Sequence, residues 1–321
     1  MYVYTGLTGG RGGTPFKSNY GDHGHLVKRL EVWQGAWQLH GIRVTFTNDR
    51  VEMIGTQTGR YAGTFDLGAG ERITSLSVWG NGAGTRCGAF KIRTSNAREY
   101  FPKMYDWGLK TEYPQIVASG YLCGIEGSAN WDIDNLGFIF LKPVKNSTLK
   151  EISYPNLNSS LVATTPFILD SLTIDNRQGS VAQESTLEGS QELEETREWS
   201  NSTGIEMSIT SSVKAGIPEI VDVSVETSVK VSNTFTFGRS QTKKITKSAS
   251  HKITCPPRSL LKASLTTYQD TLDIDYTGKV ELEFQDGDRF SYPVKGIYKG
   301  ASARSIFLKI SDGISEKIGT V

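Results

Sequence analysis

Short segments rich in β-branched and aromatic residues recur along the chain, and most are bounded by Gly, Asn or Asp. Segments of this kind, about four to eight residues long, are typical of β-strands. Helical signals, by contrast, are sparse. The pattern therefore predicts an all-β chain, and the clearest strand candidates in its first part are residues 30–33, 42–46, 73–79 and 138–141.

Two later segments, residues 272–276 and 280–284, alternate apolar with acidic residues. A period of two places successive side chains on opposite faces of a strand, so each segment predicts a half-buried antiparallel strand. Gly278 lies between the two, where a hairpin needs a turn residue. Asp286 and Gly287 offer a second turn before Phe290. We therefore expect a hairpin that reverses at Gly278.

Charge and length limit the function classes. Lys and Arg number 35 against 34 Asp and Glu, a formal net charge of +1, which argues against a dedicated nucleic-acid binder. A length of 321 residues suggests about two domains. No run of about 18 apolar residues occurs, so no transmembrane helix is expected. The N-terminus lacks a basic segment followed by an apolar one, so we expect a soluble protein that is released by a non-classical route and acts at target-cell membranes.

The two halves of the chain differ in composition. Five of the 6 tryptophans precede residue 143, whereas the later part is rich in Ser, Thr and Val. Residues 146–165 are polar and rich in Ser and Asn, so this segment is either a linker or the start of a second domain. We place the boundary near Val144, which gives domains 1–143 and 144–321. Cys87 and Cys123 both fall in the first domain, and the sequence leaves open whether they pair.

A glycine-dense loop, GGRGGTPF, occupies residues 9–16, and the segment NWDIDNLGFIFLKP ends the first domain at residues 130–143. Between them lie residues 30–46 (LEVWQGAWQLHGIRVTF), residues 70–76 (GERITSL) and the strand candidate 91–94. In this ordered series the first domain resembles the jacalin-related lectins. The resemblance implies a β-prism of three Greek-key sheets that binds sugars at one apex.

The same resemblance implies the residues of a sugar site. The backbone N–H of Gly13 would donate to the sugar, and Asp134 would accept two of its hydroxyls. Backbone groups of the Trp131–Asp132 pair would complete the ring of contacts, and residues 81–86 would form the edge that sets selectivity. The implied carbohydrate-binding residues are Gly12, Gly13, Gly84, Thr85, Arg86, Trp131, Asp132 and Asp134.

Two residues depart from the family pattern, and one feature matches a subgroup. Asn130 stands where the family usually has Gly, and Asp132 adds a second carboxylate. The glycine loop is continuous with the rest of the chain, which resembles the mannose-type members. We therefore expect cell-surface glycans, of mannose type, as partners.

The most informative stretch of the second domain is residues 205–233, where apolar and polar residues alternate in two arms. Residues 215–220 (AGIPEI) lie between the arms and predict a turn with exposed apolar residues. Each arm has about ten residues, so at about 3.3 Å per residue and a tilt near 40° it would rise roughly 25 Å, the height of an apolar membrane band. The apolar face of this predicted insertion hairpin includes Met207, Ile209, Val213, Ile217, Val223, Val225, Val229 and Val231.

A single hairpin cannot span a bilayer, because its edge N–H and C=O groups would lack hydrogen-bond partners. Copies from several subunits would have to close a barrel, with Ser, Thr, Glu and Lys lining a wet lumen and Val and Ile meeting lipid. The partners we expect are therefore the lipid membrane and further copies of the chain, which would form a homo-oligomeric ring there. A dimer in solution would shield the apolar residues before assembly.

Three segments of the second domain favour the same interpretation: residues 198–204 (EWSNSTG), 215–218 (AGIP) and 232–238 (SNTFTFG). With them, residues 149–321 resemble the aerolysin-type pore-forming module that also occurs in natterin-like proteins, where a jacalin-type lectin can precede it. The resemblance implies an insertion loop that leaves the body after ring assembly. The expected fold is thus all-β, a jacalin-like β-prism followed by an elongated aerolysin-type β-sheet module.

The leading hypothesis is a glycan-targeted pore former, and two alternatives stay open. One is a lectin that binds carbohydrate without perforating membranes. The other is an enzyme acting on carbohydrate, which we rank last because no nucleophile or acid–base set converges in the sequence. We expect no catalysis and no cofactor. We also expect no metal site, since His23 and His25 suit a surface loop. The basic residues 243–252 form either a solvated strand face or a contact with anionic headgroups.

Overall fold

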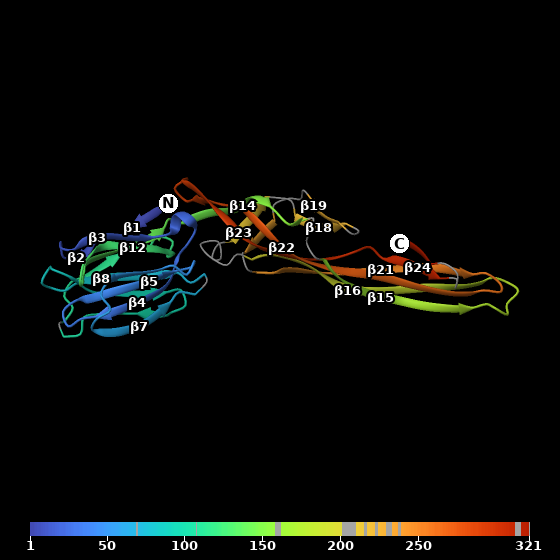
Figure 1. Cartoon of the computed structure of the whole chain (residues 1–321), viewed down its shortest axis with the longest axis horizontal. Coiled ribbons are helices and arrows are strands. Elements are labelled where there is room, and N and C mark those ends of the chain that lie inside the picture. Colours follow the sequence, from blue (N-terminus) through green and yellow to red (C-terminus); the bar gives the residue numbers. More distant parts are fainter. Residues whose placement is uncertain are drawn as a thin grey trace.

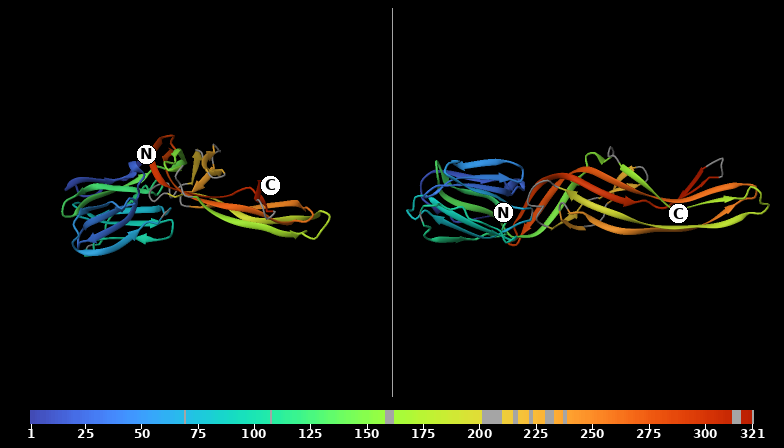
Figure 2. Two further views of the ribbon diagram at one scale, coloured as in Figure 1. Left: turned by 45° about the vertical axis from the view of Figure 1, so that its right-hand side comes forward. Right: turned by 90° about the horizontal axis from the view of Figure 1, so that it is seen from below.

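The computed structural model describes most of the chain, which is elongated (Figure 1). The described residues are 1–68, 70–106, 108–157, 162–200, 210–214, 217–221, 224–228, 233–236, 239–311 and 316–320. A prism of short strands forms one end, and long twisted strands extend away from it (Figure 2). Apart from the 3-10 turn η1 (Gly21–His23), the described regular elements are all β-strands, which confirms the all-β prediction.

Three antiparallel sheets form the prism. The first contains β1 (Tyr2–Tyr4), β2 (Thr8–Gly9), β3 (Thr14–Asn19), β12 (Leu122–Ala129) and β13 (Ile133–Leu141). The second contains β4 (Val27–Gln34), β5 (Leu39–Phe46), β6 (Val51–Gly55) and β7 (Arg60–Asp66). The third contains β8 (Ile73–Gly80), β9 (Cys87–Thr94), β10 (Glu99–Tyr100) and β11 (Glu112–Gln115).

The inner faces of the three sheets enclose one apolar core, which includes Phe46, Phe90 and Phe138. The predicted strands at residues 30–33, 42–46, 73–79 and 138–141 fall within β4, β5, β8 and β13. The predicted prism is therefore confirmed.

The second part is organised around one long strand, β22 (Leu260–Phe284). One edge of β22 pairs with β14 (Val144–Ser153) and β15 (Val162–Asp175), and its other edge pairs with β23 (Arg289–Ala303) and β24 (Phe307–Ser311). Strand β25 (Glu316–Thr320) pairs with β24. Strand β16 (Gln183–Ser200) pairs with β21 (Gln241–Cys255) along most of its length. Its last residues, 196–200, pair with β23. The two distal layers pack through an apolar cluster that includes Leu187, Ile253 and Leu265.

The predicted hairpin at Gly278 is wrong, because β22 runs straight through this glycine and pairs it with Val294. A Cβ at Gly278 would lie 3.2 Å from both Leu149 Cδ1 and the Lys150 carbonyl oxygen of β14. The glycine therefore permits close packing of the neighbouring strand rather than a turn. The predicted turn at Gly287 is confirmed: its φ is +89°, and its N–H donates to the Phe284 carbonyl at 3.0 Å.

The linker interpretation of residues 146–165 is wrong over its first part, which lies in β14. β13 ends at Leu141 and β14 begins at Val144, so almost no chain separates the prism from the module. An apolar cluster crosses the junction and joins Cys123 and Leu141 with Phe284 and Tyr292. At its edge the ammonium of Lys142 pairs with Asp286 and Asp288 at 2.6 and 2.5 Å. The prism and the module are therefore joined by a shared apolar cluster, the junction core, which is separate from the core inside the prism.

Four short strands occupy the region of the predicted insertion hairpin: β17 (Thr210–Lys214), β18 (Ile217–Val221), β19 (Ser224–Ser228) and β20 (Asn233–Thr236). β17 pairs with β20, and β18 pairs with β19, both antiparallel. In the second pair Ile217 lies opposite Ser228 and Val221 lies opposite Ser224. The predicted turn at residues 215–220 is therefore wrong from Ile217 onward. β18 and β19 form a two-stranded sheet in which Pro218 lies on an edge strand, where a missing N–H is tolerated.

The three cysteines are buried free thiols, which answers the open question of a pair between Cys87 and Cys123. Burial raises the pKa of the Cys87 thiol to about 12, and it raises the pKa of Cys123 as well. Neither thiol is poised to react at neutral pH.

We expect the stability of the prism to fall steeply in acid because of Glu71, whose side chain is 1% exposed. Burial alone would raise its pKa, but hydrogen bonds from Arg98, Thr94 and the Gly68 N–H outweigh this and lower the pKa from 4.5 to about 2. A carboxyl whose folded pKa is depressed stabilises fully above its unfolded pKa and loses that contribution as pH falls through the folded pKa. About 3 kcal/mol should therefore vanish between pH 4.5 and pH 2.

Urea unfolding followed by tryptophan fluorescence over this pH range would measure the effect. The variant Glu71→Gln should lose most of the acid dependence. The matched control is Glu99→Gln, since Glu99 belongs to an exposed pair with Arg93. An unchanged acid dependence in Glu71→Gln would contradict the assignment.

Candidate functional site

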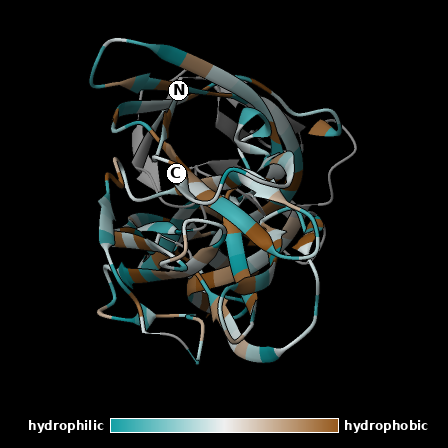
Figure 3. Cartoon of the chain, turned by 90° about the vertical axis from the view of Figure 1, so that its left-hand side faces the viewer, coloured by the Kyte–Doolittle hydropathy of each residue, from teal (hydrophilic) through white to brown (hydrophobic). Residues whose placement is uncertain are grey.

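The three loops implied for sugar binding meet at the end of the prism that points away from the module (Figure 1). Figure 3 views the molecule from this end. Cys123 of β12 and Leu141 of β13 lie in the junction core, so the turn between these antiparallel strands lies at the opposite end. The Gly10 N–H donates to the Asp134 carbonyl at 2.7 Å, which ties the glycine loop to β13. A Cβ at Gly10 would lie 2.0 Å from the Thr85 carbonyl oxygen, so the third loop is packed against the first.

The glycine loop lies directly on the carboxylate of Asp134. A Cβ at Gly12 would be 2.7 Å from Asp134 Oδ1. A Cβ at Gly13 would be 2.4 Å from Asp134 Oδ2, and its φ of +80° also favours glycine. Both glycines are therefore needed for the loop to reach the carboxylate.

The carboxylate of Asp134 is covered, with its side chain 3% exposed. Arg86 Nη1 lies 2.9 Å from its Oδ1, so the guanidinium takes a position that the resemblance assigned to sugar hydroxyls. The Arg86 side chain is itself 37% exposed. Arg86 therefore presents its N–H donors to solvent beside a carboxylate that is no longer open. This ion pair joins residues 48 positions apart, so no local sequence pattern could have predicted it.

A second carboxylate, that of Asp132, is held by three side chains. Gln38 Nε2 donates to its Oδ2 at 3.1 Å, Arg86 Nε lies 3.5 Å from the same oxygen, and His40 Nε2 lies 3.7 Å from Oδ1. Gln38 and His40 belong to the loop and strand after β4, and sequence analysis missed both. Arg86 thus bridges the two carboxylates, which do not flank an open cleft of the kind that a glycosidase needs.

The loop between β12 and β13 is fixed by its own polar contacts. Asn130, which replaces the usual glycine, donates its N–H to the Asp132 carbonyl at 3.1 Å and accepts from Thr14 Oγ1 at 2.9 Å. Thr56 Oγ1 donates to the Trp131 carbonyl at 2.9 Å. The two carbonyls are therefore engaged within the prism, whereas the residue Trp131 is 80% exposed. Trp131 immediately precedes Asp132 in the chain, so a large exposed aromatic residue adjoins the two carboxylates in sequence.

The loop of residues 81–86 is built around one buried side chain, Asn81. Asn81 Oδ1 accepts the N–H groups of Ala83 and Thr85, both at 3.2 Å, and its Nδ2 donates to Thr85 Oγ1 at 3.0 Å. Gly82 and Gly84 adopt φ values of +81° and +72° within the loop. The predicted selectivity edge is therefore preorganised, and Asn81 is a supporting residue that sequence analysis had not singled out.

The membrane-facing residues of the predicted hairpin are described only in part. Val213, Ile217 and Val225 lie in β17, β18 and β19, opposite Asn233, Ser228 and Ile220 respectively. The others lie outside the described residues: Met207, Ile209, Val223, Val229 and Val231. Their role in the membrane stays a prediction.

A short ladder connects this region to the body of the module. β17 pairs with β14 in parallel, with Thr148 opposite Ser212 and Leu149 opposite Val213. The Oγ atoms of Thr148 and Ser212 are 3.1 Å apart, and Ser212 Oγ lies 3.5 Å from the Ser147 carbonyl oxygen. The ladder of three residue pairs, from Thr148 to Lys150 of β14, is the described backbone connection between β14 and β17.

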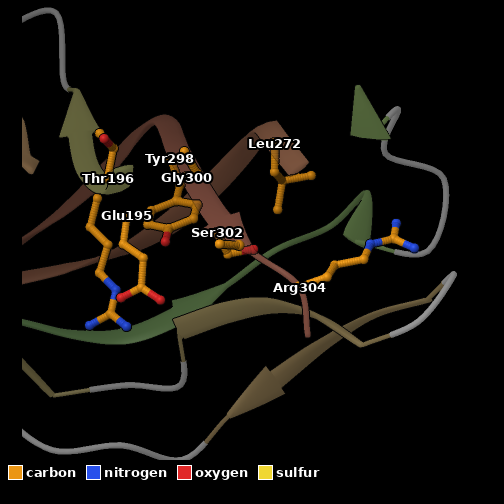
Figure 4. A pocket seen from close by; sticks show the side chains of 10 residues that line it. Glu195, Thr196, Leu272, Tyr298, Gly300, Ser302 and Arg304 are labelled. Carbon is orange, nitrogen blue, oxygen red and sulfur yellow. The ribbon is translucent and has the colours of Figure 1, made fainter. Parts of the chain in front are cut away.

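A cavity of about 220 Å³ lies where β16 leaves β23 (Figure 4). Tyr298 and Leu272 line it together with charged residues that include Glu195 and Arg304 (Figure 4). Arg304 is held by a fully buried carboxylate, that of Asp270. The cavity lies where the sheet splits, and Arg304, one of the two arginines that line it, is committed to an internal ion pair.

Other classes of site are absent from the part of the chain that the structure describes. No group of three or more His, Cys, Asp or Glu side chains there is placed to hold a metal ion. No helix in the same residues is long and apolar enough to cross a membrane.

Comparison with known protein families divides the chain in two. The family of jacalin-like lectin domains matches residues 5–139. The family of Clostridium epsilon toxin ETX and Bacillus mosquitocidal toxin MTX2 matches residues 138–310, more than half of the chain. The two matches meet at β13, next to the junction core.

Individual relatives match either part of the chain or nearly all of it. Natterin-1 of Thalassophryne nattereri is 22% identical over 177 residues, and natterin-2 of the same fish is 21% identical over 175. These alignments cover 55% and 54% of this chain but 49% and 46% of the natterins, so the chain spans about half the length of the curated relatives it matches. The crystal structure of a lamprey immune protein is 32% identical, covers 99% of both chains and superposes with a TM-score of 0.79.

Proposed function

The chain belongs to the natterin-like proteins, in which a jacalin-like lectin domain precedes a module of the ETX/MTX2 family, and from this we propose that it is a glycan-targeted pore former. In this proposal the prism binds cell-surface carbohydrate, and copies of the chain assemble and perforate the membrane. The proposal rests mainly on the presence of both modules in one chain. The loops of the sugar site lie at the far end of the prism (Figure 1), and β17 joins the module through a ladder of three residue pairs with β14.

Glycan binding brings the chain to its target. The continuous glycine loop, set on Asp134 through Gly12 and Gly13, favours mannose-type glycans. The exposed guanidinium of Arg86 and the indole of Trp131 give a sugar one polar and one apolar contact. A single contact of this size is weak, but a ring of subunits binds many glycans at once, which raises the overall avidity.

The segment proposed to insert is long enough to reach the membrane from this position. Between Ser200, where β16 ends, and Gln241, where β21 begins, the chain has 40 residues, which comprise the predicted hairpin of residues 205–233 and its flanks, and the estimate below counts all of them. Two strands of about 20 residues each would extend about 65 Å at 3.3 Å per residue. A bilayer core takes about 30 Å of that length. The remainder matches the height of the prism, since the nine residues of β13 span about 30 Å.

Insertion would exchange one set of partners for another. In the proposed pore, the apolar face of residues 205–233 meets lipid, and neighbouring copies of the hairpin satisfy each other's backbone groups as a closed barrel. The gain is burial of Val and Ile side chains in hydrocarbon. A dimer before assembly would cover the same face.

We expect Asp134→Asn to lower glycan affinity at least about tenfold, because the neutral amide no longer anchors Arg86 and the glycine loop. The measurement is binding and dye release with liposomes that carry a mannose-rich glycan. Asp49→Asn is the matched control, since Asp49 is 83% exposed on the turn between β5 and β6. Full binding by Asp134→Asn would refute the site, and equal leakage from liposomes without glycan would refute the targeting.

The second candidate is a lectin that does not perforate membranes, and the junction core favours it in one respect. A module fixed to the prism can act as a rigid spacer. Glycan binding without leakage and without detergent-resistant oligomers would establish this alternative.

A further inference from the structure

The loop between β4 and β5 brings a tryptophan to the apex that carries the sugar site. This short loop closes as a tight turn, in which the Gly35 N–H donates to the Gln38 carbonyl at 2.8 Å. The Gln38 side chain also contacts Asp132, so the turn lies beside the two carboxylates. Trp37, one of the two central residues of the turn, is 59% exposed. Among the described residues, the exposed tryptophans are Trp37 and Trp131, and both therefore lie at this apex.

A second exposed aromatic residue, Tyr105, is held against this turn. The Tyr105 N–H donates to the Gly35 carbonyl at 3.3 Å, and the N–H of the next residue donates to the Ala36 carbonyl at 3.0 Å. Tyr105 is 41% exposed. The guanidinium carbon of Arg60, the first residue of β7, lies 4.2 Å from the centroid of its ring. The turn therefore carries two exposed aromatic side chains with a cation stacked on one of them.

The exposed charges around this turn are mainly positive. Arg60 is exposed, and so is Arg11 of the glycine loop. The carboxylates of Asp132 and Asp134 are largely covered, and Asp106 is an exposed carboxylate next to Tyr105. Trp and Tyr rings have an apolar body and a polar tip, which suits the headgroup layer of a membrane, and arginine is attracted to anionic lipids. This combination of side chains therefore fits an anionic lipid surface.

The length of the segment proposed to insert also favours a membrane at this apex. The 40 residues between β16 and β21 extend about 65 Å as two strands, and the prism and the bilayer core take about 30 Å each. Little length is left for a gap between the prism and the membrane. When the segment spans the bilayer, the apex must therefore lie against the headgroups rather than at the end of a long glycan.

We propose that this apex also binds lipid directly, through an apex patch that consists of Trp37, Tyr105, Arg60 and Arg11. Trp37 and Tyr105 enter the headgroup layer, and the two arginines contact the anionic groups of the lipids. The contact is weak by itself, so glycans still determine which membrane is permeabilised. The proposal rests on the proposed function and adds a second contact between the prism and the membrane, beside the sugar site.

The test measures binding of the full chain to glycan-free vesicles by flotation, with phosphatidylcholine alone or with added phosphatidylserine. It uses the oxidised double variant Thr148→Cys/Ser212→Cys, called the locked protein, in which a disulfide holds β17 on β14 so that insertion does not contribute. The locked protein should bind the anionic vesicles more tightly than the neutral ones. Adding Trp37→Ala should lower binding to both kinds of vesicle about tenfold, because a large amphipathic side chain is lost. Adding Arg60→Gln should lower binding to the anionic vesicles alone, about fivefold.

The matched control is Ile168→Ala, since Ile168 is 67% exposed on β15 of the module, away from the prism. It should bind vesicles as the locked protein does. The melting temperature and the affinity for methyl α-mannoside, measured by calorimetry, should be the same in all these variants, since Gly13 and Asp134 remain in place.

A second measurement reports the position of the Trp37 side chain. Bromine atoms on lipid chains quench nearby indoles, so anionic vesicles that contain brominated phosphatidylcholine should quench part of the tryptophan emission of the locked protein. Trp37→Phe keeps an aromatic ring, so this variant should still bind, but it should lose a share of the quenching. Undiminished quenching in Trp37→Phe would contradict insertion of this side chain.

Three further outcomes would overturn the lipid contact. They are a locked protein that does not bind the anionic vesicles, equal binding by Trp37→Ala and Ile168→Ala, and a loss of mannoside affinity in Trp37→Ala, which would assign Trp37 to the sugar site instead. The proposed function is judged separately, by dye release from glycan-bearing liposomes with the wild type. Absence of that release would refute the pore, whereas flotation and quenching alone decide the lipid contact.

Discussion

A disulfide between positions 148 and 212 should abolish membrane leakage and leave glycan binding intact. Thr148 of β14 and Ser212 of β17 are direct partners in the parallel ladder, with their Oγ atoms 3.1 Å apart. Neighbouring strands lie about 4.8 Å apart, which is within the Cα separation that a disulfide spans. In Thr148→Cys/Ser212→Cys the bond would fix the insertion segment to the body of the module, so its strands could not leave to form a barrel.

Dye release from glycan-bearing liposomes, with and without a reductant, measures this effect. The oxidised double variant should release almost no dye, and reduction should restore release. The single variants Thr148→Cys and Ser212→Cys are the controls, and the native cysteines do not interfere because all three are buried. Normal leakage from the oxidised form would show that residues 205–233 are not the inserting segment. Loss of glycan binding would show that the prism was damaged instead.

The variant Arg304→Ala should destabilise the module by about 3–5 kcal/mol, because it leaves the carboxylate of Asp270 buried without its cation. Asp270 is 0% exposed, and the Arg304 guanidinium contacts it through Nε and through Nη2, the latter at 2.9 Å. Thr164 Oγ1 also donates to Asp270, at 2.6 Å, but a hydroxyl does not neutralise the charge. Thermal unfolding should show a melting temperature lower by about 10 °C.

The control for this prediction is Arg177→Ala. Arg177 pairs with Asp175 at 2.6 Å, but the two side chains are 64% and 52% exposed, so the loss should stay below about 1 kcal/mol. A double variant, Arg304→Met with Asp270→Leu, should recover much of the stability, since it removes both charges from the interior. Equal melting temperatures for Arg304→Ala and Arg177→Ala would contradict the assignment of the buried pair.

Local patterns determined most of the strands in advance. The strands predicted around Val32, Val44, Val78 and Phe140 are present, because the alternation of side chains across a strand is a property of the backbone alone. The resemblance of several segments, taken in order, to two known families likewise indicated both modules, and the family matches confirm them. Such signals are carried by residues close together in the chain.

The same local signals gave wrong predictions for residue types that occur both in turns and inside strands. Gly278 fits a turn, but in the fold it lies inside β22 because β14 packs too closely for a side chain. Pro218 lies two residues after Gly216, in a segment whose composition suggests a turn, yet it lies in β18, paired with Thr227. In both cases the deciding factor is the neighbouring strand, and its distance in sequence keeps it out of any local pattern.

The candidate site divides in the same way. The sequence by itself determined the glycine loop, Asp134 and the two-faced segment 205–233, since each is a contiguous motif. Only the tertiary structure decided that Arg86 covers Asp134, that Gln38 holds Asp132, and that Thr56 holds the Trp131 carbonyl. These contacts join loops from three different sheets. Their chemistry depends on which loops the prism brings to one apex, and that is fixed by the packing of the whole core rather than by any stretch of the chain.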